Sequence, residues 1–269
     1  MKIFKSIIVL ISLFMLLISC SNSGKSKTPE SAREILEKTY DKYSDLFKND
    51  AKELKTIDAK ITVKGGANLP MGEGGEMPME IDVALEMKAK QPQMFYLDIS
   101  GNLGNAILVA SGKDGETGKP KATLMLPSTK QFAVLDAPDN FMNQIPEDEQ
   151  EEEQKKEEIL EKAILEHEGM VNLKNGRAHK IIIKSKNPSE NSHVVVYILD
   201  KKWDPARLEM YEAGENKAVV EFEKLDLNKN ISDREFMPNT EGYKEVTQNQ
   251  IVTIIMMQVM ASMMQKGQE

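Results

Sequence analysis

The pattern that most constrains the fold is a long alternation of apolar and polar residues over positions 77–90. Its apolar members are Met77, Met79, Ile81, Val83, Leu85 and Met87. Successive side chains of a strand point to opposite faces, so the segment predicts a strand with one apolar and one solvated face. We interpret the apolar face as the side on which the rest of the molecule must pack.

Short strand patterns dominate the rest of the chain. We predict strands over residues 58–64, 94–100, 106–111, 122–126, 131–135, 178–186, 193–200, 207–211 and 219–227. Gly, Asn, Asp and Pro turns join them, which is typical of a meandering antiparallel sheet. The expected fold class is mainly β (α+β).

Three helical patterns interrupt the strands. Residues 29–47 form the first, with Ser31 as a possible N-cap and Glu34 three residues later. Residues 147–168 are acidic and carry Glu–Lys pairs at i,i+4, which support a solvated helix whose second half could lie on the sheet. Residues 250–265 are apolar around most of the helix, so we expect most of its circumference to be covered. Helices that only partly cover an apolar sheet face leave an apolar hollow.

The N-terminus predicts export and lipidation. Lys2 and Lys5 precede an apolar run that is too short to span a bilayer and ends at Ser19 and Cys20. Residues 17–20, Leu-Ile-Ser-Cys, resemble a bacterial lipobox, in which the thiol receives a lipid before cleavage. An ordinary signal peptide with a chance cysteine is the alternative. We therefore predict a signal peptide over 1–19, a lipidated Cys20 with a polar tether over 20–29, and one domain over 30–269.

Composition excludes several classes of function. Cys20 is the only cysteine, so disulfides and cysteine-ligated metals are excluded. The net charge of −8 argues against nucleic acid as a partner. No catalytic motif occurs, and His167, His179 and His193 show no ligand spacing. The segment starting at Asp226 imitates a calcium loop, but Ile231 replaces its glycine. We expect neither an enzyme nor a protein that needs a cofactor.

Three segments carry a resemblance to a known family. The first is the opening helix (32–38) running into the strand at 59–63, and the second is residues 85–95 followed by Ile-Leu-Val-Ala-Ser-Gly-Lys at 107–113. The third joins Tyr-Ile-Leu-Asp at 197–200 to Pro-Ala-Arg-Leu at 205–208 and the finish at 236–243. In order and spacing these segments resemble the LolA/LolB-like lipoprotein-carrier superfamily. The resemblance implies a curved antiparallel half-barrel whose helices cover a lipid-binding hollow. Gln91 stands where the soluble carrier has a basic residue that holds its lid shut.

Candidate ligand-binding residues follow from the apolar patterns and the resemblance. They are Ile81, Val83, Leu85 and Met87 on the long strand, and Ile255, Val259, Met260 and Met263 on the C-terminal helix. Methionine adapts to irregular apolar partners, although core filling is the alternative for these residues. The helix is predicted to be a lid, a plug or part of the core. Leu69 and Met71 lie in a glycine-rich loop that could contact a membrane; the alternative is a loop with incidental apolar residues.

The predicted function is a membrane-anchored envelope lipoprotein that binds acyl chains of lipids or lipoproteins for transport or insertion. Its expected partners are the membrane, through Cys20, the acyl chains, and an envelope transport protein. Its expected location is the outer membrane, facing the periplasm, if the host has one. The alternatives are an envelope-stress or lipid-status sensor that binds a partner protein, and a structural surface lipoprotein without cargo.

Overall fold

The computed structural model describes residues 31–43, 55–71, 75–90, 94–102, 104–113, 120–136, 163–187 and 191–266. Side chains are described for these ranges except 67–71, 75–78, 113, 120, 136 and 262–266. The chain divides into two compact units. Unit 1 comprises Met1–Ala51, Asn68–Met77 and Ile145–Glu221, and unit 2 comprises Lys52–Ala67, Pro78–Gln144 and Phe222–Glu269. The predicted signal peptide and lipidated cysteine lie outside the described residues.

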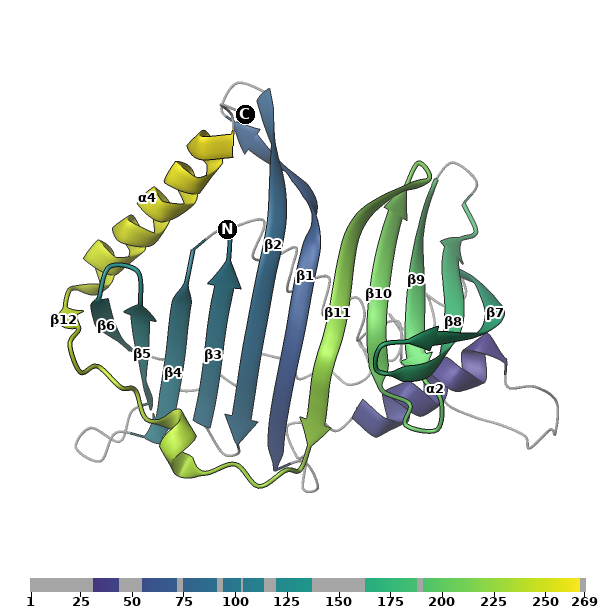
Figure 1. Ribbon diagram of the computed structural model, residues 1–269, viewed down its shortest axis with the longest axis horizontal. Helices are drawn as coiled ribbons and strands as arrows, with labels where there is room; N and C mark the ends of the chain where they lie inside the picture. Colours follow the sequence, from purple (N-terminus) through teal and green to yellow (C-terminus); the bar gives the residue numbers. More distant parts are fainter. Residues whose placement is uncertain are drawn as a thin grey trace. The chain divides into compact units, whose positions relative to one another are not determined.

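Unit 2 is built on an antiparallel meander (Figure 1). Its strands are β1 (Thr56–Met71) and β2 (Gly75–Lys90), apart from their ends within Asn68–Met77, and β3 (Met94–Gly101), β4 (Ala106–Lys113), β5 (Pro120–Leu126) and β6 (Gln131–Asp136). The short β12 (Lys244–Glu245) pairs with β6 in parallel, and the end of β11 (Glu215–Leu227) lies beside β1. The alternating pattern of β2 thus forms a strand that pairs with β3 over residues 83–90.

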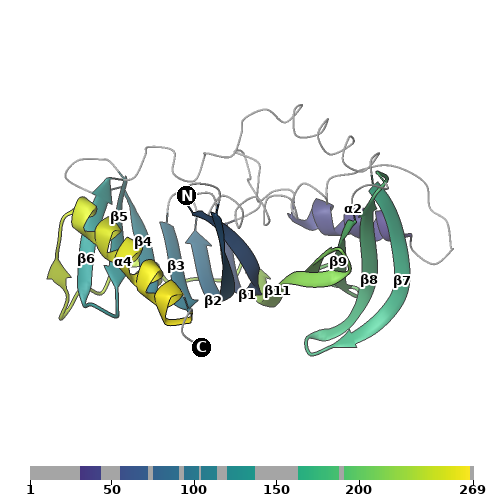
Figure 2. The same ribbon diagram turned by 90° about the horizontal axis from the view of Figure 1, so that it is seen from above.

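Two helical elements accompany the sheet of unit 2. Helix α4 (Gln248–Lys266) runs obliquely across the β6 side of the sheet (Figures 1 and 2). The short helix η3 (Asp233–Phe236) contacts β3 and β4. Ile251 of α4 is fully buried beside Leu126 and Ala133. Phe236 of η3 is also fully buried. These contacts fix both elements on the sheet by apolar burial.

Unit 1 contains a second antiparallel meander and one helix. Its strands are β7 (Ala163–Leu173), β8 (Gly176–Ser185), β9 (Ser192–Leu199), β10 (Pro205–Glu212) and the first half of β11. β7 and β8 are visibly curved (Figure 2). Helix α2 (Ala32–Tyr43) begins with the expected capping box. The Ser31 hydroxyl accepts from the Glu34 N–H at 3.2 Å, and the Glu34 carboxylate accepts from the Ser31 N–H at 2.7 Å.

The sequence predictions of fold class, of all ten strands, and of the first and last helices are confirmed. The helix expected over 147–168 is wrong where the structure describes it, because residues 163–168 begin β7. Pairing with β8 decides the conformation there, and Gly169, with φ of 100°, allows the irregular register between His167 and Gly169. The first part of that predicted helix lies outside the described residues. In the described part of the chain, no helix is long and apolar enough to cross a membrane.

Candidate functional site

The strand register gathers the apolar residues of unit 2 on one face of its sheet. Leu85 pairs with Ile99 and Met87 with Leu97 between β2 and β3. Leu97 in turn pairs with Leu108 of β4. Paired residues share a face, so these side chains lie side by side, and we call this side the apolar face of unit 2. The alternation read from the sequence thus assigns these four strand candidates to one face: Ile81, Val83, Leu85 and Met87.

Burial differs along the apolar face. Toward β1 the side chains are buried, with Ile81 8% and Val83 7% exposed. Under α4, Leu126 and Ala133 are buried again, 1% and 0% exposed, whereas Leu124 is half-buried. Between these regions lies a row of half-buried large side chains, which we call the central apolar strip: Leu85, Met87, Phe95, Leu97, Ile99 and Leu108. Apolar groups in this row retain contact area for a further apolar partner.

Helix α4 presents two different arcs. Ile251 is buried, and the half-buried Ile254 and Ile255 pack against the same cluster on the sheet, while Val259 one turn later is also half-buried. The other arc exposes Met256 and Met260, 62% and 60% accessible. The expectation that most of the helix circumference is covered is therefore wrong for its described side chains, because the sheet contacts only one side of the helix.

The remaining predicted site residues cannot be placed by their side chains. Met263 lies on α4. Leu69 and Met71 lie in strand β1, so the prediction of a loop is wrong at these two positions. The side chains of all three residues are outside the described set. Cys20 lies outside the described residues altogether. Acyl-chain binding by Met263 and membrane contact by Leu69 and Met71 stay predictions.

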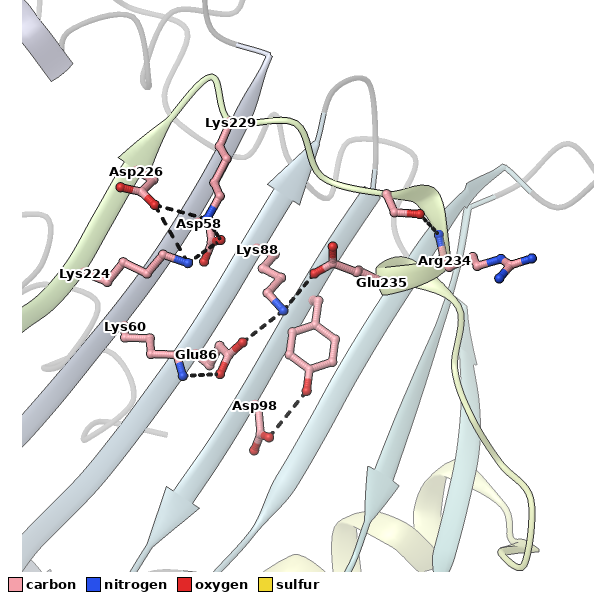
Figure 3. Close-up of polar contacts among 12 residues, drawn as sticks. Asp58, Lys60, Glu86, Lys88, Asp98, Lys224, Asp226, Lys229, Arg234 and Glu235 are labelled. Carbon is pink, nitrogen blue, oxygen red and sulfur yellow. Dashed lines mark hydrogen bonds and ion pairs between the residues drawn. The ribbon is translucent and has the colours of Figure 1, made fainter.

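On β1, β2 and β3 the opposite face of the unit 2 sheet is polar and internally paired (Figure 3). Glu86 accepts from Lys60 at 3.0 Å and from Lys88 at 2.9 Å, and Lys88 also reaches Glu235 of η3 at 2.9 Å. We call this side the polar face. In a second cluster, Asp58 and Asp226 form ion pairs with Lys224 of β11 and with Lys229, which follows that strand (Figure 3). The ion pairs hold η3 and β11 on the sheet.

The electrostatics of the polar face follow from this pairing. Hydrogen bonding from Lys88, followed by that from Lys60, holds the pKa of Glu86 below its ordinary value. Partial burial by itself lowers the pKa of Lys88, but its bonds to Glu86 and Glu235 raise it above the usual range. Burial raises the pKa of Asp98, and the Tyr96 hydroxyl donates to that carboxyl at 3.4 Å. Because the charged side chains of the polar face pair with one another, we assign this face a structural role. The apolar face is then the candidate ligand surface.

Unit 1 brings together two histidines that sequence spacing kept apart. His167 and His179 approach to 3.3 Å between ring nitrogens, and His179 stacks on Trp203 with ring centroids 5.8 Å apart. No local signal in the sequence could have paired them, because the contact depends on the β7–β8 register. Among the described residues, no group of three or more His, Cys, Asp or Glu is arranged to hold a metal ion.

Comparison with known proteins gives structural likeness without sequence relatives. The chain matches no protein-family model and no curated protein sequence. Among solved structures it is similar to an uncharacterized conserved protein from Thermus thermophilus, at 17% identity, with 81% of this chain and 100% of that chain covered and a TM-score of 0.41. It is also similar to a LolA superfamily protein from Nitrosomonas europaea, at 10% identity over 78% and 99% of the two chains, with a TM-score of 0.24.

A third similar structure is a complex of MucA and MucB from Pseudomonas aeruginosa. Identity is 8%, the TM-score is 0.38, and the match covers 78% of this chain and 64% of that one. The chain thus spans less than two thirds of that neighbour. At these TM-scores the likenesses carry no argument about ligands, which must come from the residues themselves.

Proposed function

We propose that this chain is a lipid-anchored envelope protein that binds acyl chains on the apolar face of unit 2. The observation that carries the proposal is the central apolar strip. Its six large apolar side chains, on three adjacent strands, stay half-buried although Val83 toward β1 and Leu126 under α4 are buried. A folded sheet ordinarily buries such a row, so its incomplete cover fits a face that receives an apolar ligand.

The chemistry of the strip fits a hydrocarbon chain. Burying each methylene contributes about 0.8 kcal/mol, so an acyl chain laid along the strip is held mainly by apolar burial. The charged groups of this sheet region, such as Glu86 and Lys88, lie on the polar face and are paired with each other. With few polar anchors on the binding side, selectivity among acyl chains is broad. We assign Ile255, which packs against the same cluster as Leu124, and the half-buried Val259 one turn further along α4 to the border of the site.

The envelope role rests on the predicted processing of the N-terminus. Lipidation of Cys20 tethers the chain to a membrane, facing the periplasm from the outer membrane where the host has one. Binding acyl chains beside that membrane suits a protein that receives, carries or inserts lipids or lipoproteins, together with an envelope transport partner. The strip contains no group for covalent chemistry, so the proposal is binding and transfer rather than catalysis.

The test introduces one carboxylate on either face of β2. Residues 21–269 are purified without detergent from a bacterial host, and bound lipid is measured by native mass spectrometry and extraction. Leu85→Glu places a charge in the central apolar strip, whereas Ala84→Glu places it at the adjacent exposed position on the other face. We expect lipid at near-unit stoichiometry in the unchanged protein and in Ala84→Glu, and loss of lipid in Leu85→Glu.

Two results contradict the proposal. One is a protein that stays empty after incubation with phospholipid vesicles, which favours the sensor or the structural lipoprotein. The other is equal lipid in Leu85→Glu and Ala84→Glu, which places the bound lipid away from the strip. Unfolding by urea checks that both variants are folded when they are compared.

A further inference from the structure

The outward arc of α4 is apolar and uncovered in the structure. Val252, Met256, Met257 and Met260 are 42%, 62%, 56% and 60% exposed. Their positions on the helix place them on the side away from Ile251, the residue buried against the sheet. Scattered exposed apolar residues are ordinary, but a contiguous set on one helix marks an interaction surface. We call these four residues the methionine arc.

The charge pattern indicates what covers the methionine arc. Charged residues make up 29% of the chain, yet none occurs from Val246 to Gln265, the longest uncharged run after the predicted signal peptide. A chain with a net charge of −8 is repelled by anionic surfaces, and this run is where it presents no charge. An uncharged apolar helix face enters the boundary between lipid headgroups and acyl chains without desolvating an ion.

The residue types also favour lipid over a protein partner. The residues that carry most of the binding energy in protein interfaces are enriched in Trp, Tyr and Arg, and the methionine arc contains none of these three. Unbranched methionine side chains adapt to a fluid surface of acyl chains. The exposed residues of α4 also become more apolar along the helix. Those of its first turns include polar Asn249 and Thr253, and Met256, Met257 and Met260 follow.

We propose that the methionine arc docks α4 onto a bilayer surface, with the second half of the helix lying in the headgroup region and its other arc packed on the sheet. The docking goes beyond acyl-chain binding and rests on the proposed lipid anchor only for bringing a bilayer within reach. It gives the anchored protein a defined orientation, in which the helix bordering the apolar face of unit 2 touches the membrane.

The experiment uses the mature lipidated protein in phosphatidylcholine vesicles. Lipidation blocks the only native thiol, so Ala261→Cys introduces a single reactive site on the exposed side of α4 for an environment-sensitive fluorophore. Asn249→Cys is the matched control at the polar start of the same helix. We expect a blue-shifted emission and quenching by doxyl-labelled lipid for the label at 261, and water-like emission for the label at 249.

Two sets of substitutions test the cause of the shift. Changing Met256, Met257 and Met260 to Gln removes the apolar surface, whereas changing them to Leu keeps it, and all three residue types have similar helix propensity. The Gln variant should lose the blue shift at position 261 and the Leu variant should keep it. Equal emission from positions 261 and 249, a shift that survives the Gln changes, or a shift lost in the Leu variant overturns the proposal. A shift that appears without vesicles and grows with protein concentration means that a second copy covers the arc, and also overturns it.

Acyl-chain binding in the same variants separates this proposal from the proposed function. Leu85→Glu should lose bound acyl chain and keep the shift at position 261, and the Gln variant should do the reverse. Bound acyl chain with a water-like label at position 261 refutes docking alone. A shifted label in a protein that never binds an acyl chain leaves docking standing and refutes the binding site.

Discussion

The two α-helices of the described chain are each packed on a sheet, but they expose opposite kinds of residue to solvent, charged in α2 and apolar in α4. Both start with a capping box and bury an isoleucine completely, Ile35 in α2 and Ile251 in α4. On its outer side α2 carries charges, with Arg33 bonded to Glu37 at 3.1 Å. The outer side of α4 carries the exposed methionine arc.

The difference shows that packing one side of a helix on the sheet does not account for the residues on its other side. Helix α2 has an ordinary amphipathic arrangement, in which one stripe packs and the other is solvated. It is also tied down at its end, where the Tyr43 hydroxyl donates to Asp204 at 2.5 Å. Helix α4 is apolar on both sides, so the fold accounts for only one of them. The outer side of α4 is therefore where an external partner is expected.

The largest loss of stability is expected from substitutions on the sheet-facing sides of the two helices, where both bury an isoleucine. Ile35→Ala and Ile251→Ala each remove a fully buried side chain and should lower the free energy of unfolding by about 2–5 kcal/mol. Urea unfolding measures both losses. A loss for Ile251→Ala far smaller than for Ile35→Ala would mean that α4 is only loosely held by its sheet.

A smaller effect is expected at the polar contacts that tie each helix down. Tyr43→Phe removes a hydrogen bond to a carboxylate and should cost about 1.5–3 kcal/mol. Ser128→Ala removes the acceptor of the exposed Gln258 amide, 2.8 Å away, and should cost about 0.5–1.5 kcal/mol. Urea unfolding ranks the two variants, and the reverse order would contradict the stronger tethering of α2.

The caps should differ in their response to acid. Ser31→Ala and Thr247→Ala each remove a cap and should cost about 0.5–2 kcal/mol. Hydrogen bonds from the Ser31 N–H and then its hydroxyl hold the pKa of Glu34 below 4.5. The contribution of Glu34 is therefore complete above 4.5 and is lost as the pH falls through its lowered pKa. The cap of α4 uses uncharged Gln250 and lacks this dependence.

Unfolding of the unchanged protein and of Glu34→Gln, followed from neutral pH into acid, checks this sign. The stability difference between the two should shrink as Glu34 becomes protonated, whereas the cost of Thr247→Ala should stay constant. A difference that grows in acid would contradict the lowered pKa of Glu34.

The smallest effect on stability is expected on the outer sides. The substitutions Met256→Gln, Met257→Gln and Met260→Gln should each change the free energy of unfolding by no more than about 0.5 kcal/mol, because these side chains are exposed. Arg33→Gln on the outer side of α2 is the matched control. A marked destabilisation by the Gln changes would mean that the methionine arc packs against protein rather than facing a membrane.

Period-two alternation made the apolar face of unit 2 predictable. Once residues 77–90 form a strand, Val83, Leu85 and Met87 must share a side, whatever the strand pairs with. The half-buried state of Leu97 and Leu108 beside them could not be predicted, because it depends on which parts of the face the other elements leave open. Sequence likewise could not say which arc of α4 meets the sheet.

Non-local pairing explains the predictions that failed or were missed. Ile164 and Leu165 fit a helix pattern and a strand pattern equally well, and only the partner strand β8 decides between them. Lys88 and Glu86 are neighbours on β2, but their link to Glu235 needs η3 folded back on the sheet. The same holds for His167 and His179, which meet only through the strand register.

Photo-crosslinking tests the central claim, acyl-chain binding on the central apolar strip, most directly. A fatty acid carrying a diazirine in its chain is bound to the protein and irradiated, and the labelled residues are located by peptide mass spectrometry. The account predicts labelling concentrated on the strip residues of β2, β3 and β4, and lost in Leu85→Glu but not in Ala84→Glu. Labelling confined to unit 1, or spread evenly over the surface and unchanged by Leu85→Glu, would contradict it.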